Sequence, residues 1–218
     1  MKKIFSKNLL ILLLSVSTTS NLLIAQSRVE AFSSQTPITW LGVDFSEARY
    51  LGDPGTVSQE QMKTMTININ YLLINETEKY DFHKTFDKEN ITNDIKAISD
   101  INNSIDATKI LSFNKEDYTR LNPSSIQAMV SKYNLEQNKG IGLVFIMEGM
   151  NKTLEEGAFW VTFINMSDKS VLFTERVTGK GFGFGYRNHW AGSILNGMKD
   201  IKSNRYKKWK TGSLPKGK

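Results

Sequence analysis

The chain has 218 residues, carries 28 Lys and Arg against 22 Asp and Glu for a net charge of +6, and contains no cysteine. The absence of cysteine excludes a disulfide-stapled scaffold and a lipoprotein, whose acyl anchor requires that residue, so a hydrophobic core must hold the domain together. Once the leader described next is set apart, roughly 190 residues remain, enough for one domain with a sizeable core.

The N-terminus has the organisation of a secretory leader. Its first eight residues contain three lysines and no acid, and an unbroken apolar run, Leu9–Leu14, follows. This pattern predicts a signal peptide over residues 1–25, cleaved between Ser20 and Ala31, because the run is too short for a comfortable membrane span. The chain is therefore expected to be exported, to the periplasm or the extracellular space. An uncleaved leader would instead be a marginal membrane anchor.

A single domain is expected over residues 36–203, and it begins with a strand and a helix. Alternating apolar residues predict the strand Ile38–Phe45. Asp44 near its end fits either a catalytic carboxylate beside a loop or a cap for local backbone groups, and the cap is the commoner role. The helix is predicted to start at Ser58, because Gln61 three residues later completes a capping box.

The middle of the chain alternates helices with strands. Helical spacing predicts a helix over Thr92–Asn103, and Asn122 followed by proline predicts the start of another. Lys109–Phe113 is expected to form a short strand, and the apolar Gly140–Met147 a central strand buried on both sides. His83 has no cysteine or second histidine at ligand spacing, so no metal site is predicted.

A hairpin is predicted after the central strand. Phe159–Ile164 and Val171–Val177 both alternate, and a polar turn separates them. With the earlier elements, they indicate a single-domain α/β (α+β) sandwich, in which a mixed sheet of about five strands packs with about four helices. The last helix is expected to cover one face of this sheet.

The segment after the hairpin is the most strongly patterned part of the chain. Glycine occupies every second position, at Gly179, Gly181, Gly183 and Gly185. If the segment stays extended, its bare face is expected to receive another element, while Phe182 and Phe184 on the other face enter the core. The alternative is a backbone-lined cradle for an anion or small ligand. The spacing fits neither the dinucleotide-binding fingerprint nor the P-loop.

The last helix is predicted to open at Asn188, whose side chain suits the N-cap position because it accepts hydrogen bonds from unpaired backbone N–H groups. Its apolar stripe recurs at helical spacing, at Trp190, Ile194, Met198 and Ile201. Glycines weaken this helix, a cost that a close approach to the sheet would offset.

Charge is distributed unevenly along the chain. From Arg176 to the C-terminus, Asp200 is the only acid among many Lys and Arg, and residues 204–218 are predicted to be a basic flexible tail. A solvated tail is the favoured interpretation, and peripheral contact with anionic lipid headgroups is the alternative. Because an exported protein has little reason to meet nucleic acid, that partner is set aside.

Three parts of the sequence resemble a known group. The leader, the segment TWLGVDFS and the run TGKGFGFGYRNHWAGSI look like a family of small exported Gram-negative envelope proteins of unknown function. Their layout is similar to the mixed α/β domain of CsgG-like and TolB amino-terminal-like envelope proteins. The resemblance implies a binding or assembly role in the envelope and implies no catalytic residues. The chain departs from the lipidated members of such groups because it lacks the cysteine.

Two functions remain open from the sequence. The favoured one is a non-enzymatic binding domain that contacts an envelope protein or cell-surface component through the exposed aromatic and basic residues around Arg187 and Trp190, without a cofactor. The alternative is a ligand-binding or hydrolytic pocket at the strand-to-helix junction, with His189 as acid or base, Asp44 or another carboxylate as its orienter and Arg187 for an anion. The candidate ligand-binding residues are Gly181, Gly183, Gly185, Arg187, Asn188, His189 and Trp190.

Overall fold

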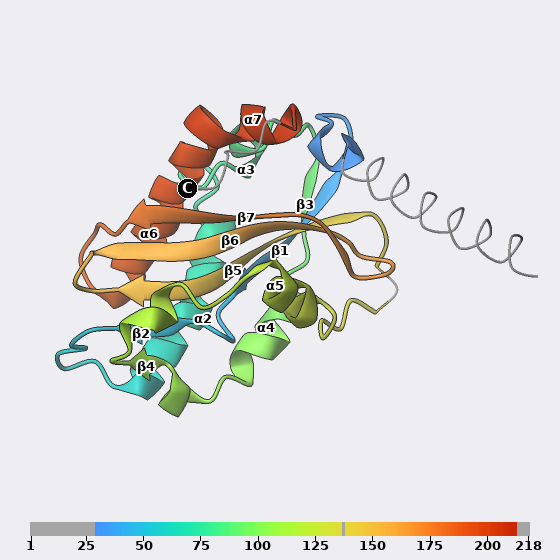
Figure 1. The fold of residues 1–218 in the computed structure, drawn as a ribbon. Helices are drawn as coiled ribbons and strands as arrows, with labels where there is room; N and C mark the ends of the chain where they lie inside the picture. Colours follow the sequence, from blue (N-terminus) through green and yellow to red (C-terminus); the bar gives the residue numbers. More distant parts are fainter. Residues whose placement is uncertain (1–28, 137, 213–218) are drawn as a thin grey trace, which may run out of the picture.

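The computed structural model describes residues 29–136 and 138–212, which form a single α/β domain (Figure 1). The predicted leader, residues 1–25, and the last six residues of the predicted tail lie outside this part of the chain. A mixed sheet packed with helices confirms the predicted fold class. The sheet has seven strands rather than about five, and the described residues contain more than the four helices expected.

The strands differ greatly in length, which explains why some were missed. They are β1 (Ile38–Asp44), β2 (Arg49–Leu51), β3 (Ile91–Asn93), β4 (Leu111–Ser112), β5 (Ile141–Asn151), β6 (Glu156–Asn165) and β7 (Ser170–Lys180). A strand of two or three residues is too short to show a hydrophobic period. The predicted helix Thr92–Asn103 is therefore wrong in its first turn, where β3 pairs with β1.

The helices include one whose start agrees with its sequence signal. They are α2 (Gln59–Asn75), α3 (Phe82–Thr85), α4 (Lys96–Asn103), α5 (Pro123–Val130), α6 (Tyr186–Asp200) and α7 (Tyr206–Lys210), with 3₁₀ turns η1 (Ala107–Lys109) and η2 (Lys115–Tyr118) and a π-helical turn η3 (Ile201–Arg205). The predicted capping box of α2 is confirmed. Ser58 Oγ accepts from the Gln61 N–H at 3.2 Å, and Gln61 Oε1 accepts from the Ser58 N–H at 2.9 Å.

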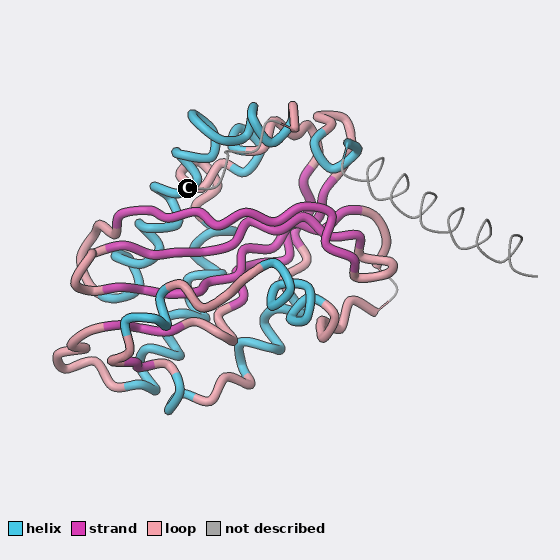
Figure 2. Tube along the Cα trace, viewed as in Figure 1, coloured by secondary structure: helices cyan, strands magenta, loops and turns pink. Residues whose placement is uncertain are grey.

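β5 is the centre of the sheet, as its apolar sequence predicted. Along one edge it pairs in parallel with β1 and then with β2, and along the other it pairs antiparallel with β6. β3 and β4 extend the parallel side, and β7 closes the antiparallel side (Figure 2). Every residue of β5 except Asn151 is buried.

Helices cover both faces of the sheet (Figure 1). One face packs against α2, α6 and α7 in an aromatic-rich core that contains Phe145, Phe159 and Trp190. The other face packs against α4 and α5 in a smaller core that contains Val144 and Trp160. The two faces of β5 thus contribute to two different cores, and successive side chains along the strand enter them alternately.

The last helix approaches the hairpin closely, as the glycine pattern predicted. A Cβ atom on Gly179 would overlap the carbonyl oxygen of Ser193 and the backbone nitrogen of Gly197 in α6. A Cβ on Gly157 would overlap the side chain of Ser193. Small residues in the hairpin and in α6 therefore let the two backbones approach closely. The apolar stripe of α6 then packs into the core.

The second half of the glycine segment differs from the prediction. β7 ends at Lys180, and Gly183 and Gly185 have φ values of 102° and 78°, so the chain turns instead of staying extended. The prediction that Phe182 and Phe184 enter the core is wrong, since they are 42% and 97% exposed. Positive φ at glycine breaks the alternation on which that prediction depended.

The basic tail begins later than predicted. The helix continues past Asp200 through η3 and α7 up to Lys210, so the boundary at residue 204 is wrong. Tyr206 and Trp209 are buried and supply the apolar face that holds this stretch on the core. Two aromatic residues at helical spacing thus outweigh the charge run that surrounds them.

A buried lysine ties the segment before β1 to the domain. Lys88 is 4% exposed, and its ammonium group donates to the carbonyl oxygens of Ser33 at 2.5 Å and Thr36 at 3.2 Å. Burial, reinforced by the charge of Lys210, lowers the pKa of Lys88 from 10.5 to about 8. The folded state therefore holds this proton less tightly than the unfolded chain does.

This difference predicts a rise in stability at alkaline pH. Between about pH 8 and 10, the unfolded chain keeps the Lys88 proton while the folded protein loses it, so stability increases with pH. We expect the free energy of unfolding in urea to rise by about 2 kcal/mol over this range relative to the variant Lys88→Met, which has no such proton. Equal pH slopes in the two proteins would contradict the assignment.

Candidate functional site

One end of the sheet gathers several loops and two cavities. The parallel strands β2, β4 and β5 end there, next to the β5–β6 turn and the loop between β7 and α6, at the left of Figure 1. Ligands of open α/β sheets commonly bind outside the carboxyl ends of strands. A ligand-binding site is therefore expected at this end of the sheet.

The first cavity, which we name the junction pocket, has a volume of about 260 Å³ and lies between β2 and the start of α6. Its walls are mainly aromatic, formed by Tyr50, Phe184, Tyr186 and Trp190. The ring of Tyr50 lies 5.6 Å from that of Tyr186 and 5.8 Å from that of Trp190, measured between centroids. The packed rings thus form an aromatic wall against which a flat apolar group can stack.

The tyrosine hydroxyls at this pocket already have partners. The Tyr50 hydroxyl donates to the carbonyl oxygen of Asp53 at 3.2 Å, and that of Tyr186 contacts the sulfur of Met150 at 3.6 Å. Burial raises the pKa of Tyr186 far above its ordinary value, so this hydroxyl stays neutral. The polar side chains left to meet a ligand in the lining are Lys152 and His189.

His189 is held where the glycine pattern predicted a close contact. Its ring packs edge-on to Trp190 at 4.7 Å, and Gly181 leaves room for it, because a Cβ there would overlap the imidazole. Its Nε2 atom is buried without a hydrogen-bond partner. Burial and the nearby Lys152 lower the pKa of His189 below its ordinary 6.5, so the ring is uncharged at neutral pH.

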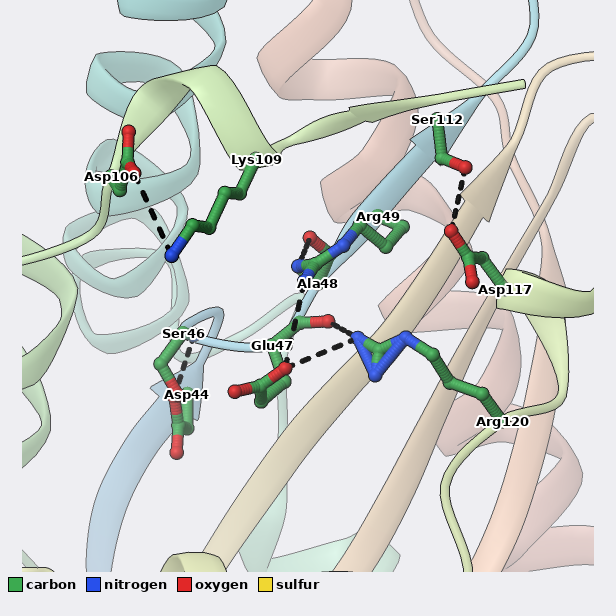
Figure 3. Close-up of polar contacts among 10 residues, drawn as sticks. All are labelled: Asp44, Ser46, Glu47, Ala48, Arg49, Asp106, Lys109, Ser112, Asp117 and Arg120. Atoms are coloured by element: carbon green, nitrogen blue, oxygen red, sulfur yellow. Dashed lines mark hydrogen bonds and ion pairs between the residues drawn. The ribbon is translucent and has the colours of Figure 1, made fainter. Parts of the chain in front are cut away.

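Asp44 does not meet His189. Its side chain is fully buried, and one carboxylate oxygen accepts from the Ser46 N–H at 2.7 Å (Figure 3). The other accepts from the Tyr133 hydroxyl, also at 2.7 Å. Tyr133 belongs to the core of the α4–α5 face, whereas Trp190, next to His189, belongs to the core of the opposite face. Asp44 therefore acts as a backbone cap, and its pKa is raised by burial.

The loops that follow β1 and β4 carry further charges that satisfy one another. Glu47 lies 3.6 Å from Arg49 and 3.5 Å from Arg120, and the Ser112 hydroxyl donates to Asp117 at 2.6 Å (Figure 3). Arg120 also donates to the Glu47 backbone carbonyl. These contacts fasten the loops together.

Two predicted site residues lie outside the junction pocket. Arg187 and Asn188 are exposed, and the guanidinium donates to Asn188 Oδ1 at 3.1 and 3.2 Å. Asn188 is not the N-cap, because Gly185 holds that position and α6 starts at Tyr186, whose ring packs against Tyr50.

The other predicted residues stand at the pocket. Gly183, Gly185, His189 and Trp190 line it, while Gly181 makes room for the imidazole. Trp190 is only 1% exposed, so it belongs to the pocket wall and does not present a surface ring as predicted.

The second cavity, which we name the apolar pocket, has a volume of about 400 Å³ and lies at the same end of the sheet. Phe113 from the end of β4 and Leu154 from the β5–β6 turn line it together with Lys115. No local pattern predicted this pocket, since its residues come from three separate segments. The same holds for Lys152, which had no motif around it.

Exposed apolar side chains concentrate at this end of the sheet. Six large ones are exposed among the described residues, and four of them belong to these loops: Phe113, Leu154, Phe182 and Phe184. The loops are joined, since Lys180 Nζ donates to the Leu154 carbonyl at 3.0 Å and the Gly181 N–H donates to the Glu155 carbonyl at 2.8 Å. Phe113, Leu154 and Phe184, which border the two pockets, are named the apolar rim.

No family model and no curated protein matches this sequence. Within residues 29–136 and 138–212, no three His, Asp or Glu side chains gather in a group able to hold a metal ion. In the same part of the chain, every helix is too short or too polar to cross a bilayer.

Proposed function

We propose that the protein is an exported, non-enzymatic binding domain of the bacterial cell envelope, and that the apolar rim is its contact surface. The concentration of exposed apolar side chains at one end of the sheet carries this proposal, because Phe113 and Phe184 are 79% and 97% exposed. Soluble surfaces rarely gather such groups unless a partner covers them. The partner is an envelope protein or another cell-surface component.

The position of the N-terminus supports the proposal. Phe32, close to the first described residue, packs against Phe163 and Phe173 at centroid distances of 5.3 and 5.1 Å. These residues pair near the start of β5, whereas the rim lies beyond its end. A chain held at its N-terminus would therefore present the rim away from the point of attachment (Figure 1).

A hydrolytic function has less support from the geometry. Within the described residues, no carboxylate hydrogen-bonds to the His189 ring, and Asp44 faces the opposite core. Glu155, the acid near the ring, is paired with Lys152 at 3.1 Å. A general base also needs a nucleophile within hydrogen-bond reach, and within the described residues no hydroxyl hydrogen-bonds to His189 Nε2.

A small ligand in the junction pocket is the second candidate, because Lys152 and His189 line this pocket together with aromatic walls. This lining suits a flat ring that bears one negative charge. The two candidates depend on different residues. A protein contact requires the exposed rim, whereas a small anion requires Lys152.

Affinity capture from envelope extracts of the producing cells tests the proposal. The double variant Phe113→Ser, Leu154→Ser, which changes no residue of the junction-pocket lining, is expected to weaken capture of the partner more than about tenfold, because two apolar anchors are lost. Tyr71→Ser is the matched control, since Tyr71 is 50% exposed on α2, away from the rim.

The outcomes separate the candidates. Equal capture by the rim variant and the Tyr71 variant would overturn the proposal. Capture or stabilisation that survives in the rim variant and disappears in Lys152→Gln would favour the small-ligand candidate. Circular dichroism of each variant verifies that the fold is intact.

A further inference from the structure

The C-terminal helix keeps one apolar stripe through a change of helix type. The chain is helical without a break from Tyr186 to Lys210, and in η3 the Tyr206 N–H bonds to the Ile201 carbonyl, five residues back. Its last buried positions are Met198, Ile201, Tyr206 and Trp209. In an ordinary α-helix, Asn204 or Arg205 would follow Ile201 on the buried face. The extra residue of the π turn places Tyr206 there instead.

Each of these four buried residues is followed by a lysine. The lysines, which we name the lysine row, are Lys199, Lys202, Lys207 and Lys210. Because successive helical residues are about 100° apart, a lysine after each buried position places all four on the same flank. All four are exposed.

Most of this charge is free of acidic partners. Lys210 pairs with Asp87 at 3.0 Å, whereas Lys199, Lys202 and Lys207 make no ion pair within the described residues. The ammonium group of Lys199 lies over the ring of Phe182, 5.8 Å from its centroid.

The groups beside the row leave it positive. Glu78, Asp81, Lys79 and Lys84 surround a hollow that also touches Lys199 and Lys202. Asp81 is engaged by Lys84 at 2.8 Å and caps α3. On the far flank of the helix, Asp200 is bonded to Arg205. The acids nearby are thus fewer than the cations and largely paired.

We propose that the lysine row binds the surface of a bilayer that contains anionic phospholipid, with Phe182 as an apolar contact beside it. Lysine ammonium groups are point charges on flexible stems and impose no fixed geometry, which suits headgroup phosphates that move laterally. The apolar stripe of the helix is already buried in the core, so the contact is peripheral and electrostatic. This surface is separate from the apolar rim.

Vesicle co-sedimentation tests the proposal with residues 29–218, which retain every core contact described above. Binding is expected to vesicles of mixed phosphatidylglycerol and phosphatidylcholine, to be absent with phosphatidylcholine alone, and to weaken at high salt. The triple variant Lys199→Gln, Lys202→Gln, Lys207→Gln is expected to bind about a hundredfold more weakly, at about fivefold per lysine.

The control is the triple variant Lys109→Gln, Lys115→Gln, Lys132→Gln, which removes the same charge from exposed lysines elsewhere. It is expected to bind within about threefold of the unmodified protein, because distant charges are screened. Equal losses in the two variants would show that binding follows net charge alone and would overturn the proposal. Binding to heparin without binding to anionic vesicles would overturn it as well, in favour of a soluble polyanion.

Discussion

Replacing Gly179 with alanine is expected to destabilise the protein by about 3 kcal/mol, at the upper end of overpacking costs. The added methyl group would meet the carbonyl of Ser193 and the backbone nitrogen of Gly197, and neither can move aside as a side chain can. The helix must therefore shift from the sheet and loosen Trp190 and Ile194 from the core. Urea denaturation measures the change.

The neighbouring Lys180→Ala is the control, since Lys180 is exposed at the end of the same strand. Its change is expected to stay within about 0.5 kcal/mol. A loss at Gly179 no larger than that at Lys180 would show that α6 does not press on the sheet backbone. Close packing on the sheet would then not explain how α6 tolerates its glycines.

Arg176→Met is expected to cost about 3 kcal/mol, because it leaves a buried charge without its partner. Glu148 in β5 is fully buried, and its carboxylate accepts from Arg176 Nε at 2.6 Å, from Trp160 Nε1 at 3.3 Å and from the Leu121 N–H at 2.5 Å. Arg176 also donates to the Tyr118 carbonyl at 2.7 Å. The pair thus fastens the segment before α5 to the sheet.

A double-mutant cycle with Glu148→Gln checks the mechanism. Adding Glu148→Gln to Arg176→Met is expected to recover stability, because the amide keeps acceptor and packing roles without the unpaired charge. Lys96→Met, which removes an exposed pair with Asp100, is expected to cost less than about 0.5 kcal/mol. Additive losses at positions 148 and 176 would contradict a coupled pair.

The structure brings some of the candidate site residues together and separates others. The glycine pattern pointed to the junction where His189 and Trp190 lie, because close backbone contact leaves a local signal. Asp44 was predicted to belong to this site only because it lies at the end of a strand. Which face of the sheet it points to depends on register with β5, and register is not visible in one strand alone.

Residues brought together by folding were missed for the same reason. Tyr50, Lys152 and Phe184 come from three distant segments and share no spacing. The short strands β2 and β4 bring two of the loops to this end: β2 pairs with an edge of β5, and β4 pairs with β2. Such pairing depends on the partner strand more than on intrinsic preference.

The sequence by itself determined the long elements: the central strand, the hairpin, α2 with its capping box, and the close contact of the last helix at Gly179. Each follows from a period or a cap that acts over a few neighbouring residues, so it is written locally. Only the tertiary structure decided the aromatic walls of the junction pocket, the exposed rim and the lysine row. These depend on which distant segments pack together and on the π turn, since burial of an apolar stripe against the core selects the helix type along its length.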